Sequence, residues 1–171
     1  MILIALGANL PSCAGPPTAT LRATLGTLKQ RNVAVRAVSS YYRSKAWPDA
    51  RDPDFVNAVA LVETELSPSG LLAVLKEIEC AFGRETTERN APRPLDLDIL
   101  DYDGKINNGS SLTLPHPRLH ERGFVLIPLR DVAPDWTHPV SGLHVDALIE
   151  FLPADARAIS KLDERIRADR N

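Results

Sequence analysis

The sequence contains little cysteine, no long apolar run and little net charge. Its two cysteines, Cys13 and Cys80, are far apart and form no C-x-x-C pair, which argues against a disulfide framework. The apolar segment 2–6 has no basic segment before it and is shorter than the ~7 residues of a signal core. No stretch approaches the ~18 apolar residues of a membrane span. A formal net charge of −2 argues against a broad surface for nucleic acid. We therefore expect a cytoplasmic protein with neither a membrane nor a nucleic acid as partner.

The common nucleotide-binding motifs are also absent. The sequence has no G-x-x-x-x-G-K-[ST], no G-x-G-x-x-G after a strand, and neither H-R-D nor D-F-G. This excludes a P-loop enzyme, a Rossmann dehydrogenase and a protein kinase. Any nucleotide must be bound by another arrangement of residues.

The composition that remains is that of one folded domain. Hydrophobic residues make up 44% and charged residues 25% of 171 residues, so we expect a single domain over 1–171 with a sizeable core. The patterns predict strands over residues 2–6, 33–42, 55–63, 95–102 and 112–114, and helices over residues 18–29 and 68–82. Segment 122–129 is apolar enough to be buried, but its pattern does not decide its type. A C-terminal tail, about 145–171, is expected to carry helices over 145–152 and 156–167.

The order of these elements predicts the fold class. Strand, helix, strand, strand, helix and strand follow one another through short links. The sequence therefore predicts an α+β sandwich with a mostly antiparallel sheet flanked by helices.

Two carboxylates on one predicted strand are the strongest chemical signal. In the segment LDLDIL at 95–100, Asp96 and Asp98 point to one face of the strand, and the apolar residues point to the other. Carboxylates two residues apart lie roughly 7 Å apart, which can bracket two metal ions ~3.5–4 Å apart. The alternative is the solvated face of an edge strand, since a D-x-D pattern is weak by itself.

Basic residues on both sides of this strand strengthen the metal interpretation. Arg84, Arg89 and Arg93 precede the strand, and segment 115–122 adds His116, Arg118 and Arg122. Arginine binds phosphate oxygens in bidentate fashion, so these residues could clamp a triphosphate. For any single arginine, a solvated surface charge is the competing interpretation.

Several other residues could bind a planar ligand. Trp47 lies in a polar loop, where a large ring needs something to cover it, and Asn57 has both a donor and an acceptor to read a heterocycle. Glu79 flanks the apolar stripe of a predicted helix and is either a boundary residue or an acceptor for a ribose or base. Phe55 and Phe124 are more often core residues.

Taken together, these segments resemble the family of 6-hydroxymethyl-7,8-dihydropterin pyrophosphokinases over residues 4 to about 134. The matching segments are LGANL at 6–10, SSYYRS at 39–44, FVNAV at 55–59, IE at 78–79, GR at 83–84, PRPLDLDIL at 92–100, LPHPR at 114–118 and ERGFVL at 121–126. Each is modest, but their order and spacing are specific to that family.

The resemblance implies a ferredoxin-like fold and transfer of a diphosphoryl group from ATP to the pterin hydroxymethyl group, with release of AMP, in tetrahydrofolate biosynthesis. It implies that Asp96 and Asp98 bind two Mg²⁺ ions, and that Arg84 and Arg93 engage the phosphates as catalytic residues. Further ATP contacts are implied for Glu79, Ile99, Thr113, His116 and Arg122. Pterin contacts are implied for Ser44, Trp47, Phe55, Asn57 and Phe124. We expect a monomer that acts on these two small molecules.

The sequence also departs from the family pattern. Ser44-Lys45 stands where Thr-Pro is frequent, Lys76 where Gln is frequent, and Thr86 where Arg is frequent. Asn90 or Ala91 lies where many members have Trp, and the loop 85–91 is one residue short. Two other functions therefore remain open: a metal-dependent nucleotide hydrolase, and a binding module without activity.

Overall fold

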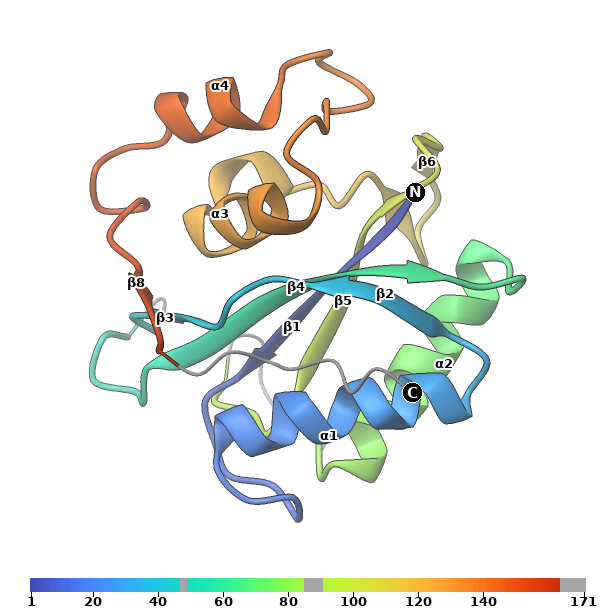
Figure 1. Cartoon of the computed structure of the whole chain (residues 1–171), viewed down its shortest axis with the longest axis vertical. Coiled ribbons are helices and arrows are strands. Elements are labelled where there is room, and N and C mark those ends of the chain that lie inside the picture. The colour runs from blue at the N-terminus through green and yellow to red at the C-terminus, as the bar shows by residue number, and fades with distance from the viewer. Residues whose placement is uncertain (47–48, 85–90, 164–171) are drawn as a thin grey trace.

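A six-stranded antiparallel sheet forms the centre of the computed structural model, which describes residues 1–46, 49–84 and 91–163 (Figure 1). Its strands are β1 (Ile2–Ala8), β2 (Ala34–Val38), β3 (Tyr42–Ser44), β4 (Phe55–Glu63), β5 (Asp96–Tyr102) and β8 (Ser160–Lys161). They pair in the order β5-β1-β4-β3-β8, and β2 pairs with the other half of β4. A separate ribbon joins β6 (Asn107–Asn108) to β7 (Thr113–Leu114). The predicted α+β class with a mostly antiparallel sheet is confirmed.

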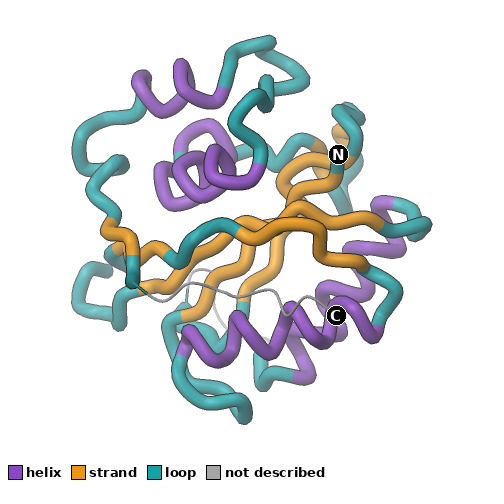
Figure 2. The backbone as a smooth tube through the Cα atoms, in the orientation of Figure 1, coloured by secondary structure: helices purple, strands orange, loops and turns teal. Residues whose placement is uncertain are grey.

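Helices cover both faces of this sheet (Figure 2). The helices α1 (Pro17–Gln30) and α2 (Pro68–Ala81) pack on one face. On the other face α3 (Gly123–Val132) packs against β4, and α4 (Val145–Phe151) packs on α3, farther from the sheet. Strand β1 supplies Ile4 and Leu6 to the first core and Leu3 to the second. A strand that is buried on both faces must be apolar at successive positions, which explains the continuous apolar run at 2–6.

The single strand predicted over 33–42 is wrong, because two strands occupy this segment. Both β2 and β3 pair with β4, and Ser39 lies between them. The N–H of Ser39 donates to the carbonyl of Val59 at 2.9 Å, and the N–H of Val59 donates to the Ser39 hydroxyl at 3.0 Å. The hydroxyl thus replaces a main-chain acceptor and lets the chain bend without losing the hydrogen bond.

Segment 122–129, whose type the sequence left undecided, begins α3 after the short 3₁₀ helix η1 (Leu119–Glu121). Pro128 lies inside α3, and Leu126 and Leu129 are buried against the sheet. An apolar run of this length, interrupted by proline, fits a short strand as well as a helix. Packing against β4 decides between them.

The C-terminal tail is only partly helical. The predicted helix 145–152 is confirmed as α4, whereas the helix predicted over 156–167 is wrong for its described residues. Residues 160–161 instead form β8 and pair with β3, and the N–H of Leu162 donates to the carbonyl of Tyr41 at 2.8 Å. The unpaired edge of β3 offers hydrogen bonds that a sequence pattern does not reveal. Residues 164–167 lie outside the described part.

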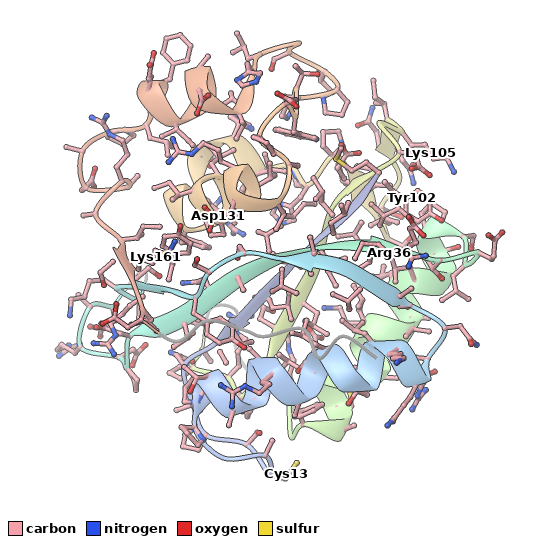
Figure 3. All side chains as sticks on the ribbon, in the orientation of Figure 1. Cys13, Arg36, Tyr102, Lys105, Asp131 and Lys161 are labelled. Atoms are coloured by element: carbon pink, nitrogen blue, oxygen red, sulfur yellow. The ribbon has the colours of Figure 1, made fainter. Side chains whose placement is uncertain are left out.

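A carboxylate on α3 anchors β3 to the helical layer above it. Asp131 on α3 accepts hydrogen bonds from the Tyr42 hydroxyl at 2.9 Å and from the Ser40 N–H at 3.1 Å (Figure 3). Burial, together with the Asp131 carboxylate, raises the pKa of Tyr42 to about 12. Tyr42 therefore stays a neutral donor across the physiological range.

His138 should make the fold less stable in mild acid. Its ring packs edge-on against Trp136, and its Nδ1 accepts hydrogen bonds from the N–H groups of Val140 and Ser141. Burial lowers the pKa of His138, His120 adds to this, and Asp101 opposes it. The unfolded chain therefore binds the proton more readily, so the free energy of unfolding falls as the pH drops below the ordinary histidine value of 6.5.

The variant His138→Asn tests this prediction, because its amide oxygen can accept the same two N–H bonds without titrating. Chemical denaturation at about pH 7.5 and about pH 5.5 should show a smaller loss of stability in the variant than in the parent chain. Equal losses in both proteins would show that other groups cause the acid sensitivity.

Cys13 and Cys80 are exposed free cysteines, and Cys13 lies at the periphery beyond α1 (Figure 3). Among the described residues, no helix has the length and apolar character needed to cross a membrane.

Candidate active site

The acidic pair lies at the start of β5, as the alternation predicts. Leu95, Leu97 and Ile99 are buried in the core beneath the sheet, and Asp96 and Asp98 point to the opposite face. The side chains of Asp96 and Asp98 remain 29% and 35% exposed, so both carboxylates can reach a ligand from solvent. The third aspartate of the segment, Asp101, does not join them. A β-bulge shifts the register of β5, and Asp101 is buried as the acceptor of the Trp136 indole N–H at 2.7 Å.

The pairing register places the acidic pair beside the segment predicted to bind the pterin. Gly7 on β1 pairs with Asp96 on one side and with Asn57 of β4 on the other. Directly paired residues share one face of a sheet, so these three residues form a row across three strands. A side-chain carbon on Gly7 would lie 3.6 Å from the Asn57 amide oxygen and 3.9 Å from Cβ of Asp96. The glycine thus leaves open space between the two groups.

This space is part of a cavity of about 580 Å³. Eight of the predicted site residues line it, namely Ser44, Phe55, Asn57, Arg93, Asp96, Asp98, Arg122 and Phe124. They come from β3, β4, β5, α3 and the segments before β5 and α3. Phe55 and Phe124 are half-buried and face the cavity, so they are not purely core residues. Trp47 lies outside the described residues.

Two arginines hold the Asp96 carboxylate. Nη1 of Arg84 lies 2.6 Å from Asp96 Oδ1, and Nη1 of Arg93 lies 3.1 Å from the same oxygen. Both guanidinium groups have further N–H donors, which are suited to the oxygens of a phosphate chain. Arginine and aspartate together therefore form a site that can bind an anion and a cation side by side.

Glu79 on α2 contacts Arg84 and helps to fix its position beside Asp96. Its carboxylate, 1% exposed, contacts Arg84, accepts from the N–H of Leu97 at 2.6 Å, and is 2.9 Å from Lys76 Nζ. Burial raises the pKa of Glu79, while the Leu97 N–H, Lys76 and Arg84 oppose that rise. The charges of Asp96 and Glu79 raise the pKa of Arg84 despite its burial. Glu79 does not line the cavity, and its contact with ATP stays a prediction.

His116 and Arg122 approach the acidic pair from the other side. His116 Nε2 is 3.8 Å from Asp98 Oδ2, and its Nδ1 accepts from the N–H of Arg118 at 3.2 Å. Burial lowers the pKa of His116, and Asp98 opposes this. Burial also lowers the pKa of Arg122, whose guanidinium lies 5.6 Å from the centre of the Phe124 ring. A phosphate chain bound at Asp98 would meet both side chains.

Ile99 and Thr113 lie apart from the cavity. The Ile99 side chain is buried in the core, so a nucleotide could meet only its main chain. Thr113 begins β7, which lies near β5. In the described part of the chain, β5 is an edge strand of the main sheet, and its outer edge faces Thr113 and α2. Their roles in binding ATP stay predictions.

The Asn57 amide has a defined orientation. Its nitrogen donates to the Ser44 hydroxyl at 2.9 Å and lies 3.4 Å from the carbonyl of Tyr42. A carbonyl can only accept, so the amide nitrogen must face it. The amide oxygen is therefore turned toward Gly7 and the cavity, as an acceptor for an N–H group.

Comparison with known proteins agrees with this geometry. Residues 3–134 match the family model of 7,8-dihydro-6-hydroxymethylpterin-pyrophosphokinase (HPPK). The chain belongs to this family. A 2-amino-4-hydroxy-6-hydroxymethyldihydropteridine pyrophosphokinase of Haemophilus influenzae is 42% identical over 149 residues, which cover 86% of this chain and 91% of that protein. Its counterpart from Synechocystis is 38% identical over 155 residues, covering 90% of this chain and 77% of that protein.

A solved structure of HPPK-DHPS from Plasmodium falciparum shares the fold. It has a TM-score of 0.66 and 14% identity, and the match covers 87% of this chain but only 44% of that longer chain. This likeness concerns the fold alone.

The donor set of this HPPK chain fits magnesium that arrives with a phosphate ligand. Among the residues that the structure describes, no group of three or more His, Cys, Asp or Glu side chains could hold a metal ion alone. Two neighbouring carboxylates are, however, what Mg²⁺ takes from a protein when phosphates and water supply its other oxygen ligands. Asp96 and Asp98 are suited to such shared coordination.

Asn9 is a residue near the site to which the sequence analysis gave no role. Asn9 is buried, and its side chain accepts from the N–H of Arg93 at 2.8 Å and donates to the carbonyl of Pro53 at 3.1 Å. It therefore ties the Arg93 segment to the loop before β4. Its place in the matched segment LGANL was a signal, but its contacts are too distant in sequence to be inferred.

Arg118, one of the arginines expected to clamp a triphosphate, also lines the cavity, whereas Glu121 and part of the C-terminal tail line it without having been predicted from the sequence. Of the departures from the family pattern, Lys76 now has a partner in Glu79. Thr86 and Asn90 lie outside the described residues, and so does most of the loop 85–91.

Proposed function

We propose that this chain transfers the β,γ-diphosphoryl group of ATP to the hydroxymethyl oxygen of 6-hydroxymethyl-7,8-dihydropterin, in tetrahydrofolate biosynthesis. A new bond forms between that oxygen and the β-phosphorus, the bond from the β-phosphorus to the oxygen of AMP breaks, and the hydroxyl proton is released. The observation that carries the proposal is the row of Asp96, Gly7 and Asn57 in one cavity. At the Asp96 end are the residues suited to phosphates, which we call the phosphate half of the cavity. At the Asn57 end are the residues suited to a flat ring, which we call the heterocycle half.

The phosphate half supplies charge. Arg84 and Arg93 would bind phosphate oxygens, with His116 and Arg122 on the opposite side of the acidic pair. Asp96 and Asp98 would hold two Mg²⁺ ions, which neutralise phosphate charge and can lower the pKa of an attacking hydroxyl. Diphosphoryl transfer depends more on such positioning and charge neutralisation than on covalent help from the protein.

The heterocycle half supplies orientation. Phe55 and Phe124 offer apolar ring faces for a flat pterin, and the Asn57 oxygen can accept from an N–H on its edge. Ser44 and Tyr42 hold the amide in that orientation. ATP would lie with its phosphates at the acidic pair and its nucleoside along the outer edge of β5, toward Glu79, Ile99 and Thr113.

One assay separates this function from its rivals. The protein is incubated with Mg-ATP in the presence and absence of the pterin, and the products are identified. AMP that forms only with pterin supports the diphosphokinase. Release of phosphate or ADP without pterin supports a nucleotide hydrolase, and tight binding of both ligands without products supports a binding module.

Asn57→Asp should impair use of the pterin while sparing ATP. The new carboxylate places an oxygen where the amide nitrogen faces the Tyr42 carbonyl, and two acceptors repel each other at that distance. We expect kcat/KM for the pterin to fall by about a hundredfold, with the KM for ATP little changed. Steady-state kinetics with each substrate varied in turn measures both values.

The matched control is Asn108→Asp, the same change on the exposed strand β6. It should leave both KM values unaltered. An Asn57→Asp variant with wild-type kcat/KM for the pterin would refute the assigned orientation of the amide.

A further inference from the structure

The C-terminal segment 153–162, which we name the strap, lies beyond the matched family segment 3–134 and yet forms part of the cavity wall. It follows α4 and crosses from the upper helical layer to the sheet edge at β8 (Figure 1). Asp155, Ala156, Ala158 and Ile159 line the cavity. The catalytic scheme assigns these residues no role.

Two contacts place the strap at the heterocycle half of the cavity. At one end, a side-chain carbon on Gly123 would lie 1.9 Å from the carbonyl oxygen of Ala156, so only glycine permits this approach. Gly123 directly precedes Phe124, one of the two aromatic residues of that half. At the other end, Ser160 and Lys161 pair with Arg43 and Tyr42 of β3, the strand that ends at Ser44.

The strap is held in place at several points. The N–H of Leu162 donates to Tyr41, and turns within the strap link Arg157 to Pro153 and Ala158 to Asp155. On the sheet side, β3 is fixed in turn by the Asp131 carboxylate on α3. A segment tied at both ends to cavity-forming elements can act as a fixed wall.

We propose that the strap is a specificity-determining wall of the pterin site, in which Ala158 and Ile159 limit the size of the heterocycle that fits beside Ser44 and Phe124. This inference rests on the proposed function. Because Ala158 is small and faces the cavity, added bulk there should occupy ligand space without disturbing the core.

The test compares Ala158→Phe with Ala154→Phe. Both alanines are exposed and lie four residues apart on the same strap, but only Ala158 lines the cavity. We expect Ala158→Phe to raise the KM for 6-hydroxymethyl-7,8-dihydropterin by about tenfold or more, with the KM for ATP within about twofold and an unchanged Tm. Ala154→Phe should leave all three values as in the parent chain.

A second variant changes Gly123 of α3, which contacts the strap at Ala156. Gly123→Ala forces the strap away from α3, so it should also raise the KM for the pterin more than that for ATP. Gly26→Ala is its control, because a side-chain carbon there meets no atom within 4 Å. Since Gly123→Ala could weaken folding, the Ala158→Phe result decides.

The inference is overturned if Ala158→Phe leaves the KM for the pterin unchanged, or raises both KM values equally. Calorimetric titration with the same pterin separates this from a failure of the proposed function. Weaker pterin binding by Ala158→Phe than by Ala154→Phe supports the strap as a wall even if the parent chain forms no AMP. Equal pterin affinity of the two variants overturns it.

Discussion

Asp98→Asn is expected to lower the turnover number by about a thousandfold while leaving the fold intact. The substitution keeps the shape of the side chain and removes one negative charge from the acidic pair. Asp98 is the better of the two for this test, because Asp96 also holds Arg84 and Arg93. The described contact of the Asp98 carboxylate is with His116, at 3.8 Å. Loss of the Asp98 negative charge should therefore affect binding of Mg-ATP more than protein stability.

The measurement is kcat at saturating pterin over a titration of Mg²⁺. We expect the residual activity of Asp98→Asn to need more Mg²⁺ than the parent chain does, because one carboxylate ligand is missing. Asp135→Asn, the same change at an exposed position in the turn after α3, should behave like the parent chain. Unchanged turnover in Asp98→Asn would falsify the role of the pair as metal ligands.

Glu79→Ala should lower both stability and activity. It removes the buried acceptor of the Leu97 N–H, which leaves a buried donor without a hydrogen-bond partner, and it breaks the ion pair with Arg84. Breaking such a buried pair costs about 3 kcal/mol of unfolding free energy. Arg84 also loses one of the two carboxylates that orient it, so we expect kcat to fall by at least tenfold.

Glu79→Gln separates the two effects. The amide oxygen can still accept from Leu97, so most of the stability should return, while the weaker hold on Arg84 should keep kcat low. Denaturant titration and steady-state kinetics on the same samples give both values. The matched control is Glu77→Ala on the same helix, where the ion pair with Arg31 is exposed and should contribute less than about 1 kcal/mol. A Glu79→Ala variant as stable as Glu77→Ala would contradict the buried network.

The local sequence pattern was sufficient to predict an element where the spacing of hydrophobic residues agreed with the residues that start and end a helix or strand. Ser67 caps α2 by accepting from the N–H of Gly70, and the apolar stripe from Leu71 to Phe82 is buried as its spacing predicts. The same alternation put Asp96 and Asp98 on one face of β5. These features depend only on neighbours within a few residues, which the sequence contains.

Local pattern failed where a distant partner decided the structure. The apparent single strand at 33–42 divides at Ser39 because the hydroxyl of that residue takes a hydrogen bond from β4. Segment 156–163 has a helix-like spacing of Ala156, Ile159 and Leu162, but the open edge of β3 draws its end into a strand. Alternation along β5 would place Asp101 on the face opposite the acidic pair, but the β-bulge brings it to the α3 side of the sheet, where it accepts the indole N–H of Trp136.

The sequence by itself determined the α+β class, the acidic pair, the arginines near it and the family, because each follows from residue type and short spacing. The tertiary structure decided how these residues meet. It placed Gly7 between Asp96 and Asn57, turned the Asn57 oxygen into the cavity, and brought the strap against Gly123. Such contacts join residues far apart in the chain, and their geometry follows from strand register and packing, which local pattern does not encode.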